Sequence, residues 1–272
     1  MVLGPILYFA IRPFYPIPFH RAMDRALMVS ALAALSLVWS RIPFRELWPR
    51  EGAGMGLLVG YALALVSAQA FLGAYLACCG FTNSGLSLVQ IGARVLMALV
   101  AALLVPPLEE TLFRGFLQGE MTRGLGRYWG WWLTAVIFML AHFFKVPTDL
   151  DGQPVHVWSG VTAIGAAFGQ IGQGTFVCGK GLNLFLLGLI LGGIVLRTGS
   201  LWVNAGLHSG MILLMLLFTG LARPIDPPRI PWLGGDILSS FVTTVVFVLL
   251  GLWLWRFYRH PSDVPGNGAN AP

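Results

Sequence analysis

The chain carries very little charge for its length. Only 10% of its 272 residues are Asp, Glu, Lys or Arg, whereas 57% are hydrophobic. A soluble domain usually has about 25% charged residues, because its surface must be hydrated. The shortage of charge therefore excludes an ordinary soluble domain and predicts an integral membrane protein, with the lipid bilayer as a partner.

Cysteine and lysine are scarce as well. The three cysteines are Cys78, Cys79 and Cys178, and their spacing fits neither a disulfide framework nor a zinc knuckle. Lys145 and Lys180 are the only lysines, so the formal net charge of +6 comes mainly from arginines. These lie mostly between apolar runs, where they match lipid headgroups, and no basic stripe with interleaved aromatic residues is present. Nucleic acid is therefore excluded as a partner.

Long apolar runs are what the chain has in abundance. A run of about 20 apolar residues is long enough to cross a bilayer. We predict eight membrane-spanning segments, at residues 26–40, 53–80, 86–108, 129–146, 159–177, 182–197, 201–219 and 237–257. The predicted fold class is all-α, a polytopic transmembrane helical bundle. We expect a single domain over residues 1–260 and a disordered polar tail at residues 261–272.

The stretches between these segments carry further structural signals. A separate helix is predicted from Leu108 to Met121, entered through Pro106 and Pro107, because proline costs little at a helix start. The proline-rich stretches from Phe143 to Trp158 and from Ala222 to Asp236 are predicted to form ordered rims or gates of the bundle.

Two adjacent carboxylates, Glu109 and Glu110, follow an apolar run directly. A charged side chain at bilayer depth costs about 2.5–3.5 kcal/mol, so such a pair persists where it is partnered or used. Arg114 is four residues after Glu110 on a helix, the favourable order for an ion pair. Glu109 points about 100° away around the helix and has no local partner. Glu109 is therefore the acid available for chemistry, although both acids could instead bridge neighbouring helices.

Two of the five histidines, His142 and His208, lie within apolar helical segments. Either could be an ordinary core histidine, but together with an unpartnered glutamate they indicate a site. Phe138 is one helical turn before His142 and could shield its imidazole. Asn204 bears the same relation to His208 and could fix its tautomer by a hydrogen bond.

A glutamate and two imidazoles suit the activation of a water molecule. A buried glutamate can act as general base, and imidazoles can orient water or stabilise an oxyanion. The same side chains, Glu109, His142 and His208, could instead ligate zinc with one position left open. The sequence alone does not separate the two schemes. It has no His-Glu-x-x-His run, which excludes a conventional zinc-protease helix.

The order of these residues resembles a known family. The motifs are Glu109-Glu110-Thr111-Leu112-Phe113-Arg114, the segment from Phe138 to His142, and His208 after the turn Thr198 to Trp202. Over residues 90–215 the chain is similar to the CPBP family, the CAAX-protease and bacteriocin-processing membrane enzymes that include the Rce1-type endopeptidases. The catalytic core is expected in this segment.

The resemblance implies a role for each residue of the motifs. Glu109 would be the general base that acts on a water, and His142 would help to hold that water. Glu110 and Arg114 would shape the site or contact the substrate, and His208 would contribute to the oxyanion pocket. The family has been described both as metalloproteases and as glutamate-dependent proteases. We favour the reaction without a metal cofactor, because no ligand set here exceeds one carboxylate and two imidazoles.

One position departs from the family pattern. The family usually has Asn four residues after the last histidine, where this chain has Ile212. We predict an intramembrane endopeptidase of a bacterial inner membrane, which cleaves a membrane-associated protein or peptide in C-terminal processing or sorting-signal removal. Ile212 keeps open a non-catalytic scaffold or binding protein on the same fold. A proton-coupled transporter is a third alternative, although no inverted repeat is visible.

Overall fold

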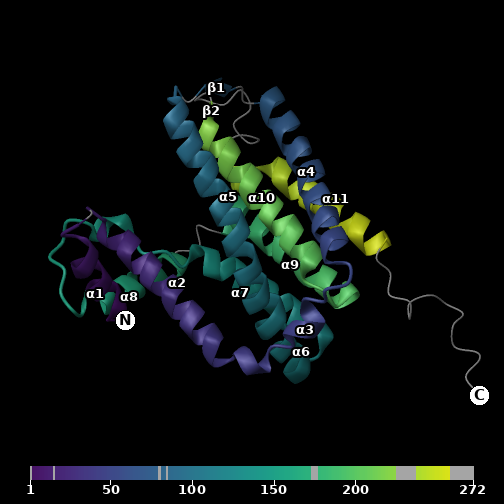
Figure 1. Ribbon diagram of the computed structural model, residues 1–272, viewed down its shortest axis with the longest axis horizontal. Coiled ribbons are helices and arrows are strands. Elements are labelled where there is room, and N and C mark those ends of the chain that lie inside the picture. Colours follow the sequence, from purple (N-terminus) through teal and green to yellow (C-terminus); the bar gives the residue numbers. More distant parts are fainter. Residues whose placement is uncertain are drawn as a thin grey trace, which may run out of the picture.

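The computed structural model describes residues 2–14, 16–78, 81–83, 85–172, 177–224 and 237–257. Nearly all of these residues are helical, which confirms the all-α prediction (Figure 1). The longer helices are α1 (Leu3–Ile11), α2 (Phe19–Leu37), α4 (Ala53–Cys78), α5 (Leu88–Glu110), α6 (Gln118–Leu125), α7 (Arg127–Phe143), α8 (Ser159–Gly172), α9 (Leu182–Thr198), α10 (Trp202–Leu221) and α11 (Phe241–Phe257). The short elements are η1 (Trp39–Arg41), α3 (Phe44–Leu47), η2 (Thr111–Leu117), η3 (Thr148–Leu150), η4 (Val177–Gly181), η5 (Ile237–Ser239), and the antiparallel strands β1 (Phe81–Asn83) and β2 (Ala222–Pro224).

Five helical stretches within the described residues are long and apolar enough to cross a membrane. They are Ala53–Gly73, Leu88–Leu125, Arg127–Leu150, Gly179–Thr198 and Trp202–Leu221. The chain is thus a multi-pass integral membrane protein. Shorter apolar helices, Ser159–Gly169 and Phe241–Arg256, account for two more of the eight predicted segments. The predicted segment 26–40 falls in α2 and η1, which are not among the helices long and apolar enough to cross a membrane.

The helix that carries the two glutamates runs on without a break. Pro106 and Pro107 lie inside α5, so the prediction of a helix start at these prolines is wrong. Proline has no N–H, and each therefore removes one hydrogen bond to the preceding turn. The next turns widen into the π-helical element η2, and the Thr111 hydroxyl donates to the Pro107 carbonyl at 2.7 Å. A π-helical turn of this kind is frequent at functional sites.

Glycine lets α10 lie directly against α4. A Cβ atom added at Gly60 would lie 2.3 Å from the carbonyl oxygen of Val203 and 2.8 Å from the Cα of Gly206. One turn further on, a Cβ at Gly210 would lie 2.5 Å from the Ala64 side chain. Small residues at such spacing allow close backbone contact between membrane helices. Because His208 lies between Gly206 and Gly210, this packing determines its position.

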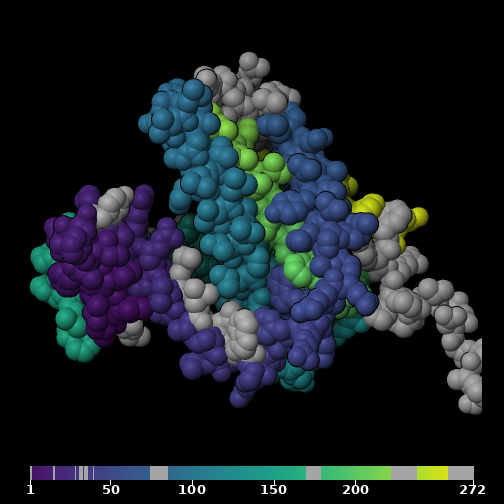
Figure 2. All heavy atoms as spheres, in the orientation of Figure 1, coloured from purple at the N-terminus to yellow at the C-terminus, as the bar shows by residue number. Residues whose placement is uncertain are grey.

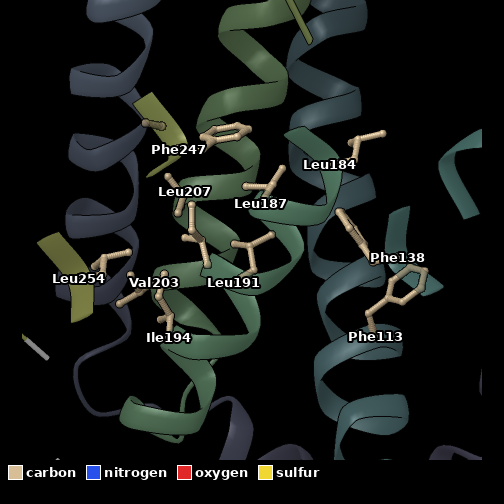
Figure 3. Close-up of a cluster of buried hydrophobic side chains, with 12 residues drawn as sticks. Phe113, Phe138, Leu184, Leu187, Leu191, Ile194, Val203, Leu207, Phe247 and Leu254 are labelled. Carbon is tan, nitrogen blue, oxygen red and sulfur yellow. The ribbon is translucent and has the colours of Figure 1, made fainter. Parts of the chain in front are cut away.

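The main hydrophobic core joins α9 and α10 to their neighbours. Figure 3 shows Leu191 and Ile194 of α9 beside Val203 and Leu207 of α10, with Phe247 above them. Phe113 of η2 and Phe138 of α7 contact edge to face at the other side of the core, with ring centroids 5.2 Å apart. These two rings hold η2 against α7.

A second, smaller core forms an N-terminal lobe of α1, α2 and α8. Its buried residues include Tyr8, Phe19, Met23, Val146 and Ala163. Figures 1 and 2 show the lobe beside the helix bundle, and α8 of the lobe contacts α7 of the bundle. The predicted rim from Phe143 to Trp158 connects α7 to this lobe. Most of the other predicted rim, Ala222 to Asp236, and the predicted tail at 261–272 lie outside the described residues.

The contact between α4 and α10 should tolerate no added methyl group. We expect Gly60→Ala to lower stability by about 1–3 kcal/mol, because the new Cβ must push α10 away. Gly54→Ala is the matched control, since a Cβ at Gly54 of α4 would meet nothing within 4 Å. Thermal unfolding in mild detergent would measure both. Equal melting temperatures for the two variants would contradict the close packing.

Candidate active site

The residues of the three motifs meet where α5, η2, α7 and α10 come together. Glu109 and Glu110 end α5, and Arg114 lies in η2. Phe138 and His142 come from the last two turns of α7, and Asn204 and His208 come from the first half of α10.

The Glu110 carboxylate is fully buried and accepts hydrogen bonds from three side chains. Arg114 donates through Nη1 at 3.2 Å and His208 through Nδ1 at 2.8 Å, both to Oε1. The amide of Asn204 donates to Oε2 at 3.0 Å. The predicted ion pair of Glu110 with Arg114 is confirmed. Charge-assisted hydrogen bonds of this kind offset the cost of burying the carboxylate.

Asn204 does not hold the His208 ring as predicted. Its amide nitrogen donates instead to Glu110 and to the backbone carbonyl of Leu191, at 2.8 Å for the latter. An ionised carboxylate is a stronger acceptor than a neutral ring nitrogen, which accounts for this choice. Glu110 itself orients His208, because its Oε1 accepts a hydrogen bond from Nδ1 of the ring.

Glu109 has a carboxylate oxygen that makes no hydrogen bond to any described residue. Its Oε2 lies 3.8 Å from Nε2 of His208 and has no hydrogen-bond partner among the described residues. Its side chain is 28% exposed, whereas that of Glu110 is 0% exposed. His208 therefore lies between two carboxylates, with one ring nitrogen held by Glu110 and the other directed at Glu109.

Phe138 lies between the two histidines and beside the buried arginine. Its ring centroid is 4.5 Å from that of His142 and 6.0 Å from that of His208, so it shields His142 as predicted. The guanidinium carbon of Arg114 lies 4.2 Å from the same ring, a cation–π contact. His142 Nδ1 is 2.8 Å from the Phe138 carbonyl oxygen, which can only accept, so Nε2 is the nitrogen available to a substrate or water.

A cavity of about 600 Å³ opens beside the two imidazoles. His142, His208 and Thr243 supply its polar side chains, and the remaining described lining residues are apolar. The lining follows α10 from His208 to Leu221 and includes faces of α4, α9 and α11. Ile212, one turn after His208, is part of this wall, so the position that departs from the family pattern borders the site directly.

The side chains proposed as alternative zinc ligands do not form a metal site in this arrangement. Within the described part of the chain, no three His, Cys, Asp or Glu side chains are grouped closely enough to hold a metal ion. Glu109, His142 and His208 thus share one cluster without forming a coordination sphere.

The sequence does not indicate that Glu110 accepts from His208, or that the Leu191 carbonyl accepts from Asn204. Leu191 is 13 residues from Asn204 and lies on a different helix, and His208 is 98 residues from Glu110. Nothing in the local spacing of α9 or α10 indicates either bond, because both depend on how three helices pack.

Comparison with known proteins agrees with the motifs. The family described as type II CAAX prenyl endopeptidase Rce1-like has a model that matches residues 91–214. This range includes the residues of the three motifs and nearly coincides with the predicted segment 90–215, so the resemblance is confirmed. No curated protein and no solved structure matches the chain.

Removal of the Glu110 charge should destabilise the fold. Glu110→Gln leaves the buried guanidinium of Arg114 without its ion-pair partner, which typically costs about 3–5 kcal/mol. We expect the double variant Glu110→Gln, Arg114→Gln to recover part of this loss. Thermal unfolding in detergent would measure all variants.

The chain offers a matched control for this prediction. Glu120 and Arg123 form an exposed pair, with side chains 36% and 60% exposed. Glu120→Gln should change stability by about 1 kcal/mol or less, because exposed pairs contribute little. Equal losses of stability for Glu110→Gln and Glu120→Gln would contradict a larger contribution of the buried pair to the fold.

Proposed function

We propose that the chain is an intramembrane endopeptidase in which Glu109 activates the attacking water, and the match of residues 91–214 to the Rce1-like family of endopeptidases supports this. The observation that carries the proposal is the pair of environments at the two glutamates. Glu110 is saturated with donors, whereas Glu109 has an unpaired oxygen 3.8 Å from an imidazole at the edge of a cavity. A carboxylate in that setting can accept a proton from water.

The reaction balances with the residues present. Glu109 takes one proton from a water molecule while the oxygen of that water attacks the carbonyl carbon of the scissile peptide bond. The C–N bond then breaks, and the proton passes from Glu109 to the leaving amine. General base catalysis of this kind contributes about 10²–10⁴-fold to the rate.

His208 is suited to stabilise the negative charge that develops on the carbonyl oxygen. Its Nδ1 is held by Glu110, so the ring is fixed with Nε2 on the side of Glu109. An N–H at Nε2 would be placed to donate a hydrogen bond to the oxyanion, while Nδ1 of the same ring is held by Glu110. Donors fixed in advance in a site of low dielectric are the most effective kind of oxyanion stabilisation.

His142 completes the proposed site from the opposite helix. Its Nδ1 is bound to the Phe138 carbonyl, which leaves Nε2 as an acceptor for a proton of the attacking water. Glu109 and His142 would thus share the two protons of one water molecule and orient its lone pair towards the substrate.

The cavity supports a substrate that is apolar next to the scissile bond. Apart from the two histidines, Thr243 is the only polar residue among the described lining residues. The cavity therefore offers few partners for charged or amide groups, whose burial without hydrogen bonds is costly. A membrane-associated protein or peptide provides such an apolar segment. C-terminal processing or removal of a sorting signal in a bacterial inner membrane is the setting we propose.

Replacement of the proposed base should abolish turnover and leave the fold intact. Glu109→Gln keeps the shape of the side chain but cannot accept a proton, so we expect a loss of about 10²–10⁴-fold in kcat. The assay is cleavage of a membrane-peptide library by the protein in liposomes, read by mass spectrometry, beside a melting curve. Glu120→Gln, on the exposed surface of α6, is the control for the charge change. Near-normal turnover in well-folded Glu109→Gln would refute the assigned role.

The proposed reaction without a metal cofactor has its own test. Purified protein should contain no stoichiometric zinc and should retain its turnover in strong chelators. Metal analysis and the same cleavage assay measure this. Loss of turnover in chelator, with recovery on addition of zinc, would instead make His142 and His208 ligands.

A non-catalytic binding protein is the second candidate, and the apolar Ile212 in the cavity wall favours it. In that case the cavity would bind an apolar segment without cleaving it. Retention of the library peptides by the wild-type protein, with no cleavage products, would select this candidate over the endopeptidase.

A further inference from the structure

The connection that leaves α7 directly after His142 is tied to the N-terminal lobe. Residues 144–158 lead from α7 to α8, and the helices α1 and α2 lie before the segment that matches the family. Figure 1 shows α2 and α8 together in the lobe, next to α7. The carboxylates of Asp24 and Asp151 form hydrogen bonds between α2 and this connection.

Asp151 provides the first contact by capping α2 from a distance of 131 residues in sequence. Its Oδ1 accepts from the backbone N–H of His20 at 3.0 Å, and its Oδ2 is bonded to the imidazole Nδ1 of the same residue. The first N–H groups of a helix have no partner within the helix. A carboxylate there satisfies one of them and faces the positive end of the helix dipole.

Asp24 provides the second contact, one turn later on α2. Its Oδ1 accepts from the backbone N–H of Val146 at 3.4 Å. The Val146 side chain is 4% exposed and belongs to the core of the lobe, with Phe19 and Met23 of α2. The connection is thus bound to α2 at Val146 by both its backbone and its side chain.

The segment between this attachment at Val146 and His142 is short. Only Phe143, Phe144 and Lys145 separate His142 from Val146. Their backbone is itself bonded, from the Phe144 N–H to Ala141 at 3.3 Å and from the Lys145 N–H to Phe143 at 2.9 Å. A displacement of Val146 is therefore transmitted to the last turn of α7.

We propose that Asp24 and Asp151 are positioning residues, which fix the end of α7 against the lobe and thereby hold His142 beside the cavity. The catalytic consequence rests on the proposed function, in which His142 orients the water. Most of the lobe precedes residues 91–214, which match the family. The lobe then contributes to the site by fixing the position of His142. Release of either carboxylate contact lets the end of α7 move without unfolding the bundle.

Hydrogen exchange of the full-length protein in detergent tests the proposal without any substrate. We expect Asp24→Ala and Asp151→Ala to speed exchange of the amides at residues 141–151 by about tenfold, the effect of an ordinary lost cap. Asp151→Asn keeps an acceptor oxygen and should restore most of the protection. Asp149→Ala is the matched control, because Asp149 is an exposed residue of the same connection and its carboxylate makes no hydrogen bond to α2 among the described residues.

Turnover separates positioning from simple stabilisation of the lobe. In the cleavage assay, Asp24→Ala and Asp151→Ala should lower kcat with little change in KM and with an unchanged main unfolding transition, and Asp151→Asn should rescue kcat. Faster exchange confined to the first turn of α2, with residues 141–146 still protected, would overturn the proposal. If an alanine variant does not fold, His20→Ala, which removes the imidazole bonded to Asp151, provides the same comparison. A wild-type protein without turnover would refute the proposed function, while the exchange data would still decide whether the contacts hold α7.

Discussion

A carboxylate buried at the centre of an apolar bundle must be surrounded by donors, and the site is organised around this requirement at Glu110. Arg114, His208 and Asn204 supply these donors, the first from the next turn of the same helix and the others from α10. The three bonds join η2 to α10, and the contact of Arg114 with Phe138 adds α7. Because Glu110 binds all of these donors, Oε2 of Glu109 has no hydrogen-bond partner among the described residues.

The same requirement explains why backbone irregularity is concentrated at this point. Two prolines and a π-helical element flank the glutamates within one long membrane helix. A regular α-helix would keep every backbone hydrogen bond. The interruption sacrifices some of them next to Glu109 and Glu110, and a π-helical turn of this kind is frequent at functional sites. The Thr111 hydroxyl returns one hydrogen bond to the Pro107 carbonyl.

Helix packing provides the other half of the geometry. The Gly60–Gly206 contact brings α10 against α4, and this fixes which face of α10 is directed at the glutamates. Asn204 and His208 lie on that face, and Ile212 continues it into the cavity wall. The polar site and the apolar cavity are therefore consecutive turns of one helix face, a suitable arrangement for cutting a chain whose neighbouring segment is apolar.

The sequence by itself determined the features that depend on composition and on neighbours along one helix. The low charge and long apolar runs required a membrane bundle, and the spacing of Glu110 and Arg114 predicted their ion pair, because residues four apart face each other on a helix. The proline pair was misjudged, since its position inside a continuous helix depends on the surrounding bundle. Only the tertiary structure decided that His208 is held by Glu110 and that Asn204 is not its partner. Those bonds join residues 94 and 98 positions apart, and they follow from the rotation of α10 that its glycine contact with α4 imposes.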